Sequence, residues 1–231
     1  MPELPEVETY LRAFRARIVD HPLESVRVRS PSLVRTFDPP LSEVRGRRVL
    51  AVSRLGKRIV WHMDDDLYLV IHLMVTGRFH RRKPGAAVPK KHAHAAFDFP
   101  RETFLLTERG IRKKASLHLV RGAQALEELN PGGLEPLEIS LETFGERLVR
   151  ENRTLKRALT DPRIFSGIGN AHSDEILHRA GLSPVQRTRN LSTEEVAGLF
   201  EAVQHDLRRW TDLLAEETGQ SFPEKITAFH P

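Results

Sequence analysis

The chain has 231 residues, enough for one large domain or two domains of ordinary size with a substantial core. Its 36 lysines and arginines outnumber 31 aspartates and glutamates, and the formal charge of +5 is compatible with a phosphate-rich partner. No cysteine is present, which excludes a disulfide framework and a thiolate metal site within these residues, and no run of about 18 apolar residues offers a membrane span.

The first residues place a potential nucleophile next to a carboxylate. If the initiator Met1 is removed, Pro2 becomes the N-terminus and presents a secondary amine, and α-amino groups have an ordinary pKa of about 7.7–8.0. A fraction of that amine is neutral at physiological pH and can attack an electrophilic carbon. Glu3, directly beside it, is a residue type that donates and accepts protons. The same residues also suit an ordinary acidic helix start, because prolines and acids commonly begin helices.

An amphipathic helix is predicted directly after this start. Apolar residues recur on one helical face at Val7, Leu11, Phe14 and Ile18. Glu6 lies in the first turn, where negative charge complements the helix dipole. This helix should pack on a core and hold the N-terminus at its exposed beginning. The first 20 residues contain four acids and no apolar segment typical of a secretory signal, so we expect an intracellular, cytoplasmic protein.

Residues 25–120 show the pattern of short strands separated by turns. Apolar and β-branched residues gather in brief runs at 26–28, 49–52, 59–61, 67–71, 95–99, 104–106 and 117–120. Such a series, with no helix-length periodic stretch, predicts an all-β sandwich or barrel without βαβ units. The basic tract from Arg78 to Lys91 is predicted to be a loop, which either reaches phosphates or is simply solvated.

The second half of the chain has helical periodicity. Two prolines and two glycines within 130–136 break any regular element and mark a linker. Beyond it, apolar spacing predicts helices near 141–149 and 155–159, and a long helix after Ser192, which forms a capping box with Glu195. The predicted fold is therefore α+β. It comprises an N-terminal β-sandwich with a leading helix (1–129), a linker (130–139), a helical domain (140–216) and a tail (217–231).

A glycine-rich turn at 166–170 leads into a further helix. Such a turn exposes backbone N–H groups at a helix N-terminus, which is a ready anion site. Asn170, at the expected cap position, would add its side-chain amide to a bound phosphate. An ordinary helix–turn–helix corner also explains the two glycines, because a tight turn needs them anyway.

Four segments resemble the formamidopyrimidine-DNA glycosylase and endonuclease VIII family of base-excision repair enzymes. The N-terminal MPELPEVET is similar to the start of the formamidopyrimidine branch, and Leu55–Arg58 is similar to the family's lysine-bearing strand start. His72–Arg78 is similar to the family's HLxMxGR stretch, with a shift around the methionine. Leu155–Pro184 is similar to its helix–two-turns–helix element.

The resemblance implies a bifunctional DNA glycosylase and AP lyase that excises 8-oxoguanine and formamidopyrimidines from double-stranded DNA. It further implies a monomer, associated with the bacterial nucleoid during repair. Catalysis would use Pro2 as the nucleophile, Glu3 as the proton donor to the sugar ring oxygen, Lys57 beside the phosphates, and Glu6 in support. DNA binding would use His72, Lys156 and Asn170 at phosphates, Met74 in the gap left by the flipped base, and Arg112 against the orphaned base.

Two departures from the family pattern leave alternatives open. Lys114 stands where the family's second wedge carries a phenylalanine, and the C-terminal zinc finger with its four cysteines is missing after the tail. We therefore expect no cofactor in these residues, and zinc only if a longer parent protein carries a finger. The alternatives are a non-catalytic damaged-DNA-binding protein of the same fold, and a glycosylase for oxidised pyrimidines of the endonuclease VIII type.

Overall fold

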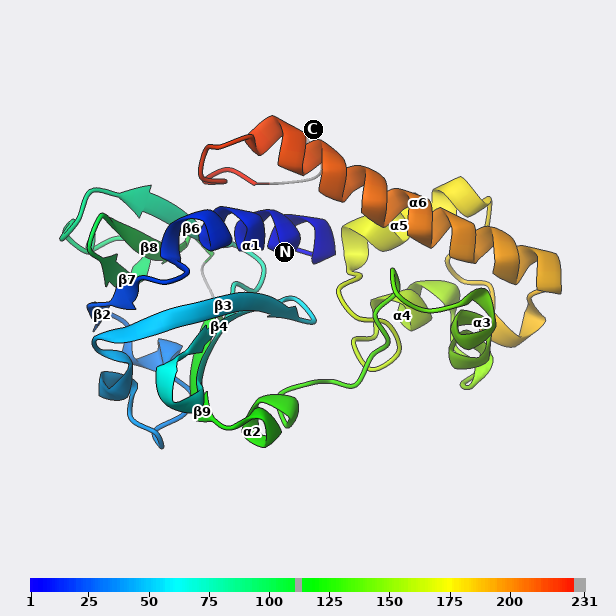
Figure 1. The fold of residues 1–231 in the computed structure, drawn as a ribbon. Coiled ribbons are helices and arrows are strands. Elements are labelled where there is room, and N and C mark those ends of the chain that lie inside the picture. Colours follow the sequence, from blue (N-terminus) through cyan, green and yellow to red (C-terminus); the bar gives the residue numbers. More distant parts are fainter. Residues whose placement is uncertain (111–113, 227–231) are drawn as a thin grey trace.

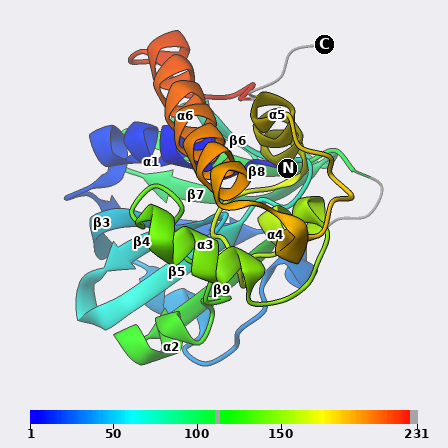
Figure 2. The ribbon, with the colours of Figure 1, turned by 90° about the vertical axis from the view of Figure 1, so that its right-hand side faces the viewer.

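A β-rich half and a helical half make up the computed structural model, which describes residues 1–110 and 114–226 (Figure 1). Helix α1 (Leu4–Ile18) runs along the β-rich half, and the long helix α6 (Thr193–Thr218) extends from the helical half back over α1. The N-terminus lies where the two halves meet, as both views show (Figures 1 and 2).

Local sequence fixes where α1 begins. The Glu6 side chain accepts a hydrogen bond from the Glu3 backbone N–H at 3.0 Å, the reciprocal contact of a capping box. Pro5 lies in the first turn, where a helix needs no N–H donor. The predicted apolar stripe is confirmed, because all its members are buried: Val7, Leu11, Phe14 and Ile18.

The strands form two antiparallel sheets. One has the order β1-β3-β4-β5-β9 and the other has the order β2-β7-β8-β6. The strands are β1 (Pro22–Leu23), β2 (Ser25–Val28), β3 (Arg47–Leu55), β4 (Arg58–Met63), β5 (Leu67–His72), β6 (Gly77–Arg82), β7 (Ala93–Phe99), β8 (Glu102–Glu108) and β9 (Ser116–Arg121).

Aromatic side chains join the two sheets and α1 into one core. Phe14 of α1 packs edge-on against Trp61, Phe79 and Phe104, with ring centroids 5.1–5.2 Å apart. Trp61 of the first sheet in turn packs against Phe97 of the second at 5.2 Å. Edge-to-face pairs at such distances are favourable, and here they fill the space between the sheets. The predicted N-terminal β-sandwich with a leading helix is confirmed.

The helical half has its own apolar cluster, to which Leu4 of α1 also contributes. Its helices are α3 (Leu141–Val149), α4 (Leu155–Thr160), α5 (Asn170–Ala180) and α6, after a short α2 (Ala123–Glu127). The predicted capping box of Ser192 and Glu195 begins α6. Residues 130–139 contain no helix or strand beyond an isolated bridge from Leu134 to Phe165. The predicted domain bounds themselves stay a prediction.

The structure corrects the prediction for the basic tract. Residues 77–82 form β6 at the edge of the second sheet, where they pair with β8, and only the rest of the tract is irregular. An edge strand tolerates charged residues on its outer side, and a single inward aromatic, Phe79, is enough to anchor it. None of the helices in the described ranges has the length and apolar character needed to cross a membrane.

Candidate active site

The Glu3 carboxylate occupies the N-terminus of α5. One oxygen accepts the backbone N–H of Gly169 at 2.6 Å and that of His172 at 3.2 Å, and the other accepts the N–H of Ala171 at 3.0 Å. Gly169, not Asn170, is the cap residue, because Asn170 already has helical geometry. The glycine-rich turn is thus an anion site, as predicted, but the anion that its inner N–H groups bind is a carboxylate of the same chain.

Gly169 is required by this close approach. A Cβ atom at this position would lie 2.4 Å from the Glu3 carboxyl carbon and 2.8 Å from Lys57 Nζ. Leu4 also bonds to the same turn, since its N–H donates to the Gly167 carbonyl at 2.9 Å. The first residues of the chain are therefore tied to the turn before α5 by both backbone and side chain.

Lys57 brings a cation to this carboxylate from the opposite half of the molecule. It lies in the tight turn between β3 and β4, where Gly56 has a φ of +62°. Burial lowers the pKa of Lys57 from its ordinary value, while Glu3 and Glu6 oppose that shift. The predicted catalytic residues Glu3 and Lys57 are thus neighbours, together with the supporting Glu6.

The terminal amine belongs to the same cluster. Its pKa at Met1 is lowered from 8.0, first by burial and then by Arg78, with Lys57 adding to the effect while Glu3 and Glu6 oppose it. Pro2 is buried beside it. While Met1 is present the Pro2 nitrogen is an amide, so a secondary amine arises here only when Met1 is removed.

Two buried residues that the sequence analysis did not identify, His172 and Asp206, lie next to this cluster. His172 of α5 lies between Asp206 of α6, 2.7 Å from its Nδ1, and Glu6 of α1, 3.8 Å from its Nε2. Burial opposes charge on the imidazole, but Asp206 and Glu6 outweigh it and raise the pKa of His172 to about 9. The backbone N–H of His172 also donates to the Glu3 carboxylate.

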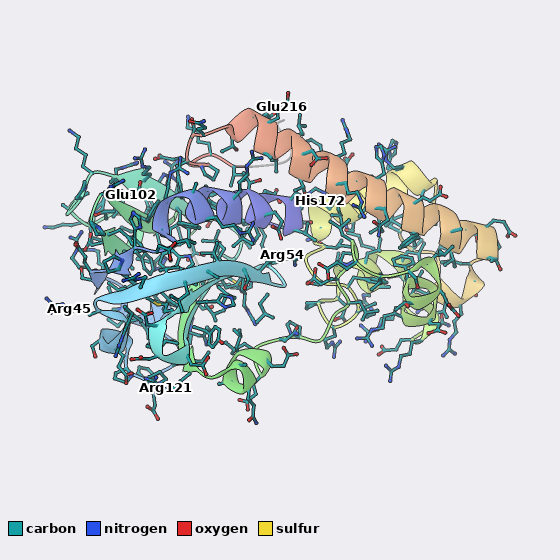
Figure 3. All side chains as sticks on the ribbon, viewed as in Figure 1. Arg45, Arg54, Glu102, Arg121, His172 and Glu216 are labelled. Carbon is teal, nitrogen blue, oxygen red and sulfur yellow. The ribbon has the colours of Figure 1, made fainter. Side chains whose placement is uncertain are left out.

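Arg54 links the halves on the other side of α1. Its guanidinium donates to Glu8 of α1 at 3.0 Å, to Ser166 of the glycine-rich turn at 3.1 Å, and to Glu135 of the 130–139 segment. Figure 3 labels Arg54 and His172, and both lie at the junction of the β-rich and helical halves. This network keeps α1, β3 and the turn before α5 in a fixed arrangement.

The turn after β5 carries the predicted DNA-contacting residues His72 and Met74. Burial, with the charges of Arg58, Lys57 and His118, lowers the pKa of His72 to about 4, so its imidazole is neutral at pH 7. The His72 Nε2 atom has no hydrogen-bond partner among the described residues.

Met74 has a φ of +53°, a backbone conformation that is uncommon for a residue with a side chain. Its side chain is half-buried, whereas its neighbour Val75 is 57% exposed. The exposed apolar tip of this turn is therefore Val75.

The remaining predicted DNA-binding residues divide into three cases. Asn170 is exposed at the start of α5, free to face a partner. Lys156 of α4 instead binds within the chain, donating to the Asn170 carbonyl at 2.7 Å and pairing with Asp174 at 2.5 Å. Arg112 lies outside the described residues. Among the described residues that follow, Lys114 and Ala115 donate their backbone N–H groups to buried Glu108.

A cavity of about 560 Å³ is lined in part by Arg78, the residue whose charge also lowers the pKa of the terminal amine. Its lining combines basic and hydroxyl-bearing groups with apolar surface, and the other lining residues are Thr76, His80, Arg82, Thr107, Arg109, Glu224, Lys225 and Ile226. Among the described residues, no three histidines, aspartates or glutamates are placed to hold a metal ion.

Comparison with known proteins matches both halves. Residues 1–116 match the model of the formamidopyrimidine-DNA glycosylase N-terminal domain, and residues 133–218 match that of the formamidopyrimidine-DNA glycosylase H2TH domain. The fold and these matches define a two-part protein in which an N-terminal β-sandwich is joined to a helix–two-turns–helix unit. The chain belongs to the formamidopyrimidine-DNA glycosylase family.

Individual relatives agree in sequence and structure. The chain is 36% identical to the formamidopyrimidine-DNA glycosylase of Heliobacterium modesticaldum, over 98% of this chain and 83% of that protein. It is 34% identical to that of Solibacter usitatus, over 88% of this chain and 74% of that protein. Lactococcus lactis Fpg in complex with abasic-site DNA has a TM-score of 0.83 and 27% identity, covering 91% of this chain and 80% of that one.

Proposed function

We propose that this chain is a DNA glycosylase and AP lyase of base-excision repair, with the N-terminal Pro2 as its nucleophile. The observation that carries the proposal is the cluster at the start of α5. There Pro2 is buried directly before Glu3, and the Glu3 carboxylate and the Lys57 ammonium lie together at the junction of the two halves, where the pKa of the Met1 amine is lowered. These are the groups that imine chemistry at a sugar carbon needs: a neutral amine, a proton carrier and a cation beside it.

The steps follow from these groups. After loss of Met1, the Pro2 lone pair attacks C1′, and the bond from C1′ to the base breaks, its electron pair leaving on the base, which takes a proton from solvent. The proton of the new ammonium passes to Glu3, which delivers it to the ring oxygen as the C1′–O4′ bond opens and an iminium forms. The iminium acidifies the C2′–H bond. Loss of that proton expels the 3′ phosphate, a second elimination expels the 5′ phosphate, and water then releases Pro2.

Lys57 and Glu6 support this chemistry without forming bonds to the sugar. The Lys57 cation lies beside Glu3 and binds the phosphates that flank the damaged nucleotide. Its charge also lowers the pKa of the terminal amine and so favours the deprotonated form. Glu6 holds the Glu3 backbone N–H and thereby the peptide that follows Pro2.

The DNA duplex binds across the junction of the halves, and the enzyme works as a monomer in the bacterial cytoplasm at the nucleoid. Asn170 and neutral His72 donate to phosphates, and Arg112 reads the orphaned base. The turn with Met74 and Val75 enters the stack, an insertion that offsets part of the unstacking cost of a few kcal/mol. Because Val75 is the exposed side chain of the pair, it is the stronger candidate for the wedge. Zinc would enter only through a finger in a longer parent protein.

The flipped base enters the cavity beside Arg78. Its basic and hydroxyl-bearing lining suits the carbonyl oxygens of 8-oxoguanine and formamidopyrimidines. A solved neighbour supports this substrate class: a mutant of Lactococcus lactis Fpg was crystallised with Fapy-dG-containing DNA, and that structure has a TM-score of 0.84 to this chain.

Strand incision on defined duplexes tests the proposal. Glu3→Gln should lower incision at a single 8-oxoguanine by at least about a hundredfold, the usual range for a lost acid–base group, while duplex binding remains. Glu142→Gln, an exposed carboxylate of α3, is the matched control and should incise as the parent does. Equal incision by the Glu3 variant, or none by the processed parent, would favour the non-catalytic binder. Preference for a thymine glycol duplex would favour the oxidised-pyrimidine alternative.

A further inference from the structure

A fully buried histidine joins three helices directly beneath the N-terminus. His172 of α5 is 0% exposed, and its two carboxylate neighbours, Glu6 of α1 and Asp206 of α6, are 5% and 2% exposed. The ring nitrogens lie 2.7 Å from Asp206 Oδ2 and 3.8 Å from Glu6 Oε2. The imidazole therefore bridges α1, which begins two residues after the candidate nucleophile, and α6 of the helical half. Figure 3 labels His172, which lies near the end of α1.

His172 contacts the Glu3 side chain directly and the Glu3 backbone through Glu6. The His172 backbone N–H donates to the Glu3 carboxylate at 3.2 Å. Its ring faces Glu6, and Glu6 accepts the Glu3 backbone N–H at 3.0 Å. A shift of His172 would thus move the peptide between Pro2 and Glu3 as well as the carboxylate.

Charge explains why a histidine suits this position. Two buried carboxylates repel each other and lose hydration, so a cation placed between them is stabilising. The charged groups that act on His172 are Glu6 of α1, Asp206 of α6, and Glu3 directly before α1. Glu3 and Glu6 in turn interact with Lys57 of the β3–β4 turn and with the terminal amine, whose pKa Arg78 also lowers. Burial opposes ionisation of Glu6, but His172 outweighs it and lowers the pKa of Glu6.

We propose that His172 is a positioning residue, which as an imidazolium bridging Glu6 and Asp206 holds the Pro2–Glu3 peptide in the orientation needed for attack on C1′. Since its side chain is fully buried, it acts through Glu6 and Glu3 and not by contact with DNA. Asp206 orients the ring from behind. This inference rests on the proposed Pro2 chemistry.

Single-turnover imine formation on an abasic-site duplex, trapped with borohydride from pH 6 to 10, tests the role. The methionine-processed parent should lose rate above about pH 9, as His172 loses its proton. His172→Gln should be at least tenfold slower at pH 7, with its duplex Kd within twofold of the parent, and should lack the alkaline decline. His178→Gln, an exposed histidine of the same helix, is the matched control and should behave as the parent.

Asp206→Asn gives an independent arm if the histidine variant does not fold. It should lower the pKa of His172, followed by NMR of the imidazole Cε1–H, and move the alkaline decline of the rate to lower pH by a similar amount. A merely structural role would not couple these two titrations. Parent-like rates in both variants, or an alkaline decline that ignores Asp206→Asn, would overturn the positioning role. A parent that forms no adduct at any pH would instead overturn the Pro2 chemistry itself.

Discussion

At the scale of single residues, the site depends most directly on the missing side chain of Gly169. A methyl group there would meet the Glu3 carboxyl and Lys57 at distances far inside contact. Because the Glu3 carboxylate is held by three backbone N–H groups, Gly169→Ala should displace it and Lys57, at an overpacking cost of about 1–3 kcal/mol in the free energy of unfolding. Incision should fall by more than tenfold.

Gly198→Ala provides the control for that change. Nothing lies within 4 Å of a Cβ on Gly198, in the interior of α6, so the same substitution should keep incision and raise stability slightly. Thermal unfolding and incision measured on both variants test whether the site needs a glycine at position 169. Parent-like incision by the Gly169 variant would show that the close approach is not needed.

The turn after β5 offers a second test at this scale, between Met74 and Val75. Val75→Ala should slow excision of a paired 8-oxoguanine by about tenfold and leave cleavage at a pre-formed abasic site less affected, because only the former needs a base to be unstacked. Its thermal unfolding should match the parent, since Val75 is exposed. If Met74→Ala slows excision and Val75→Ala does not, Met74 is the wedge, as the sequence resemblance implies.

At the scale of elements, the contact of α1, α5 and α6 at His172 makes stability depend on pH. The pKa of His172 is about 9 in the folded chain against an ordinary 6.5, so the folded state binds the proton more tightly. Its contribution to stability is therefore fully present below about pH 6.5 and is lost as the pH rises through about 9. The difference in unfolding free energy between the parent and His172→Gln should shrink from pH 6.5 to pH 10. A difference that is constant over that range would contradict the assigned charge.

The sequence predicted the secondary-structure elements better than it predicted the contacts within the site. The stripe of α1 and the capping box of α6 are local periodic signals, and the structure confirms both. Strand β6 was missed because an edge strand rich in arginine lacks the apolar alternation that marks a strand.

The contacts that bring the site residues together could not be predicted from local sequence patterns. Asp206 lies 34 residues from His172, and Glu135 lies 81 residues from Arg54. Such pairs are set by how elements distant in the sequence pack together, which no spacing rule predicts from one sequence. The glycine-rich turn was identified as an anion site from its pattern, but its ligand came from residue 3 of the chain.

At the scale of the whole molecule, the internal pairing of Lys156 predicts how DNA binding responds to salt. Each phosphate neutralised by a protein cation contributes about −0.9 to the slope of log K against log salt for a DNA duplex. Lys156 is already paired with Asp174 and holds the start of α5, so Lys156→Met should weaken DNA binding by disturbing that helix start, without changing the slope. Asn170→Ala removes an uncharged donor, so it should also weaken DNA binding and leave the slope unchanged. A slope reduced by about one in the Lys156 variant would show that it binds phosphate directly.

In the proposed mechanism the two halves of the molecule meet to place a terminal proline amine at a sugar carbon. Borohydride trapping on a duplex with a single abasic site, followed by peptide mapping of the adduct by mass spectrometry, tests it most directly. Protein whose intact mass shows loss of Met1 should form a covalent adduct at Pro2, and Pro2→Gly should form it far more slowly. An adduct that maps to Lys57, or no adduct from processed protein that binds the duplex, would contradict the claim.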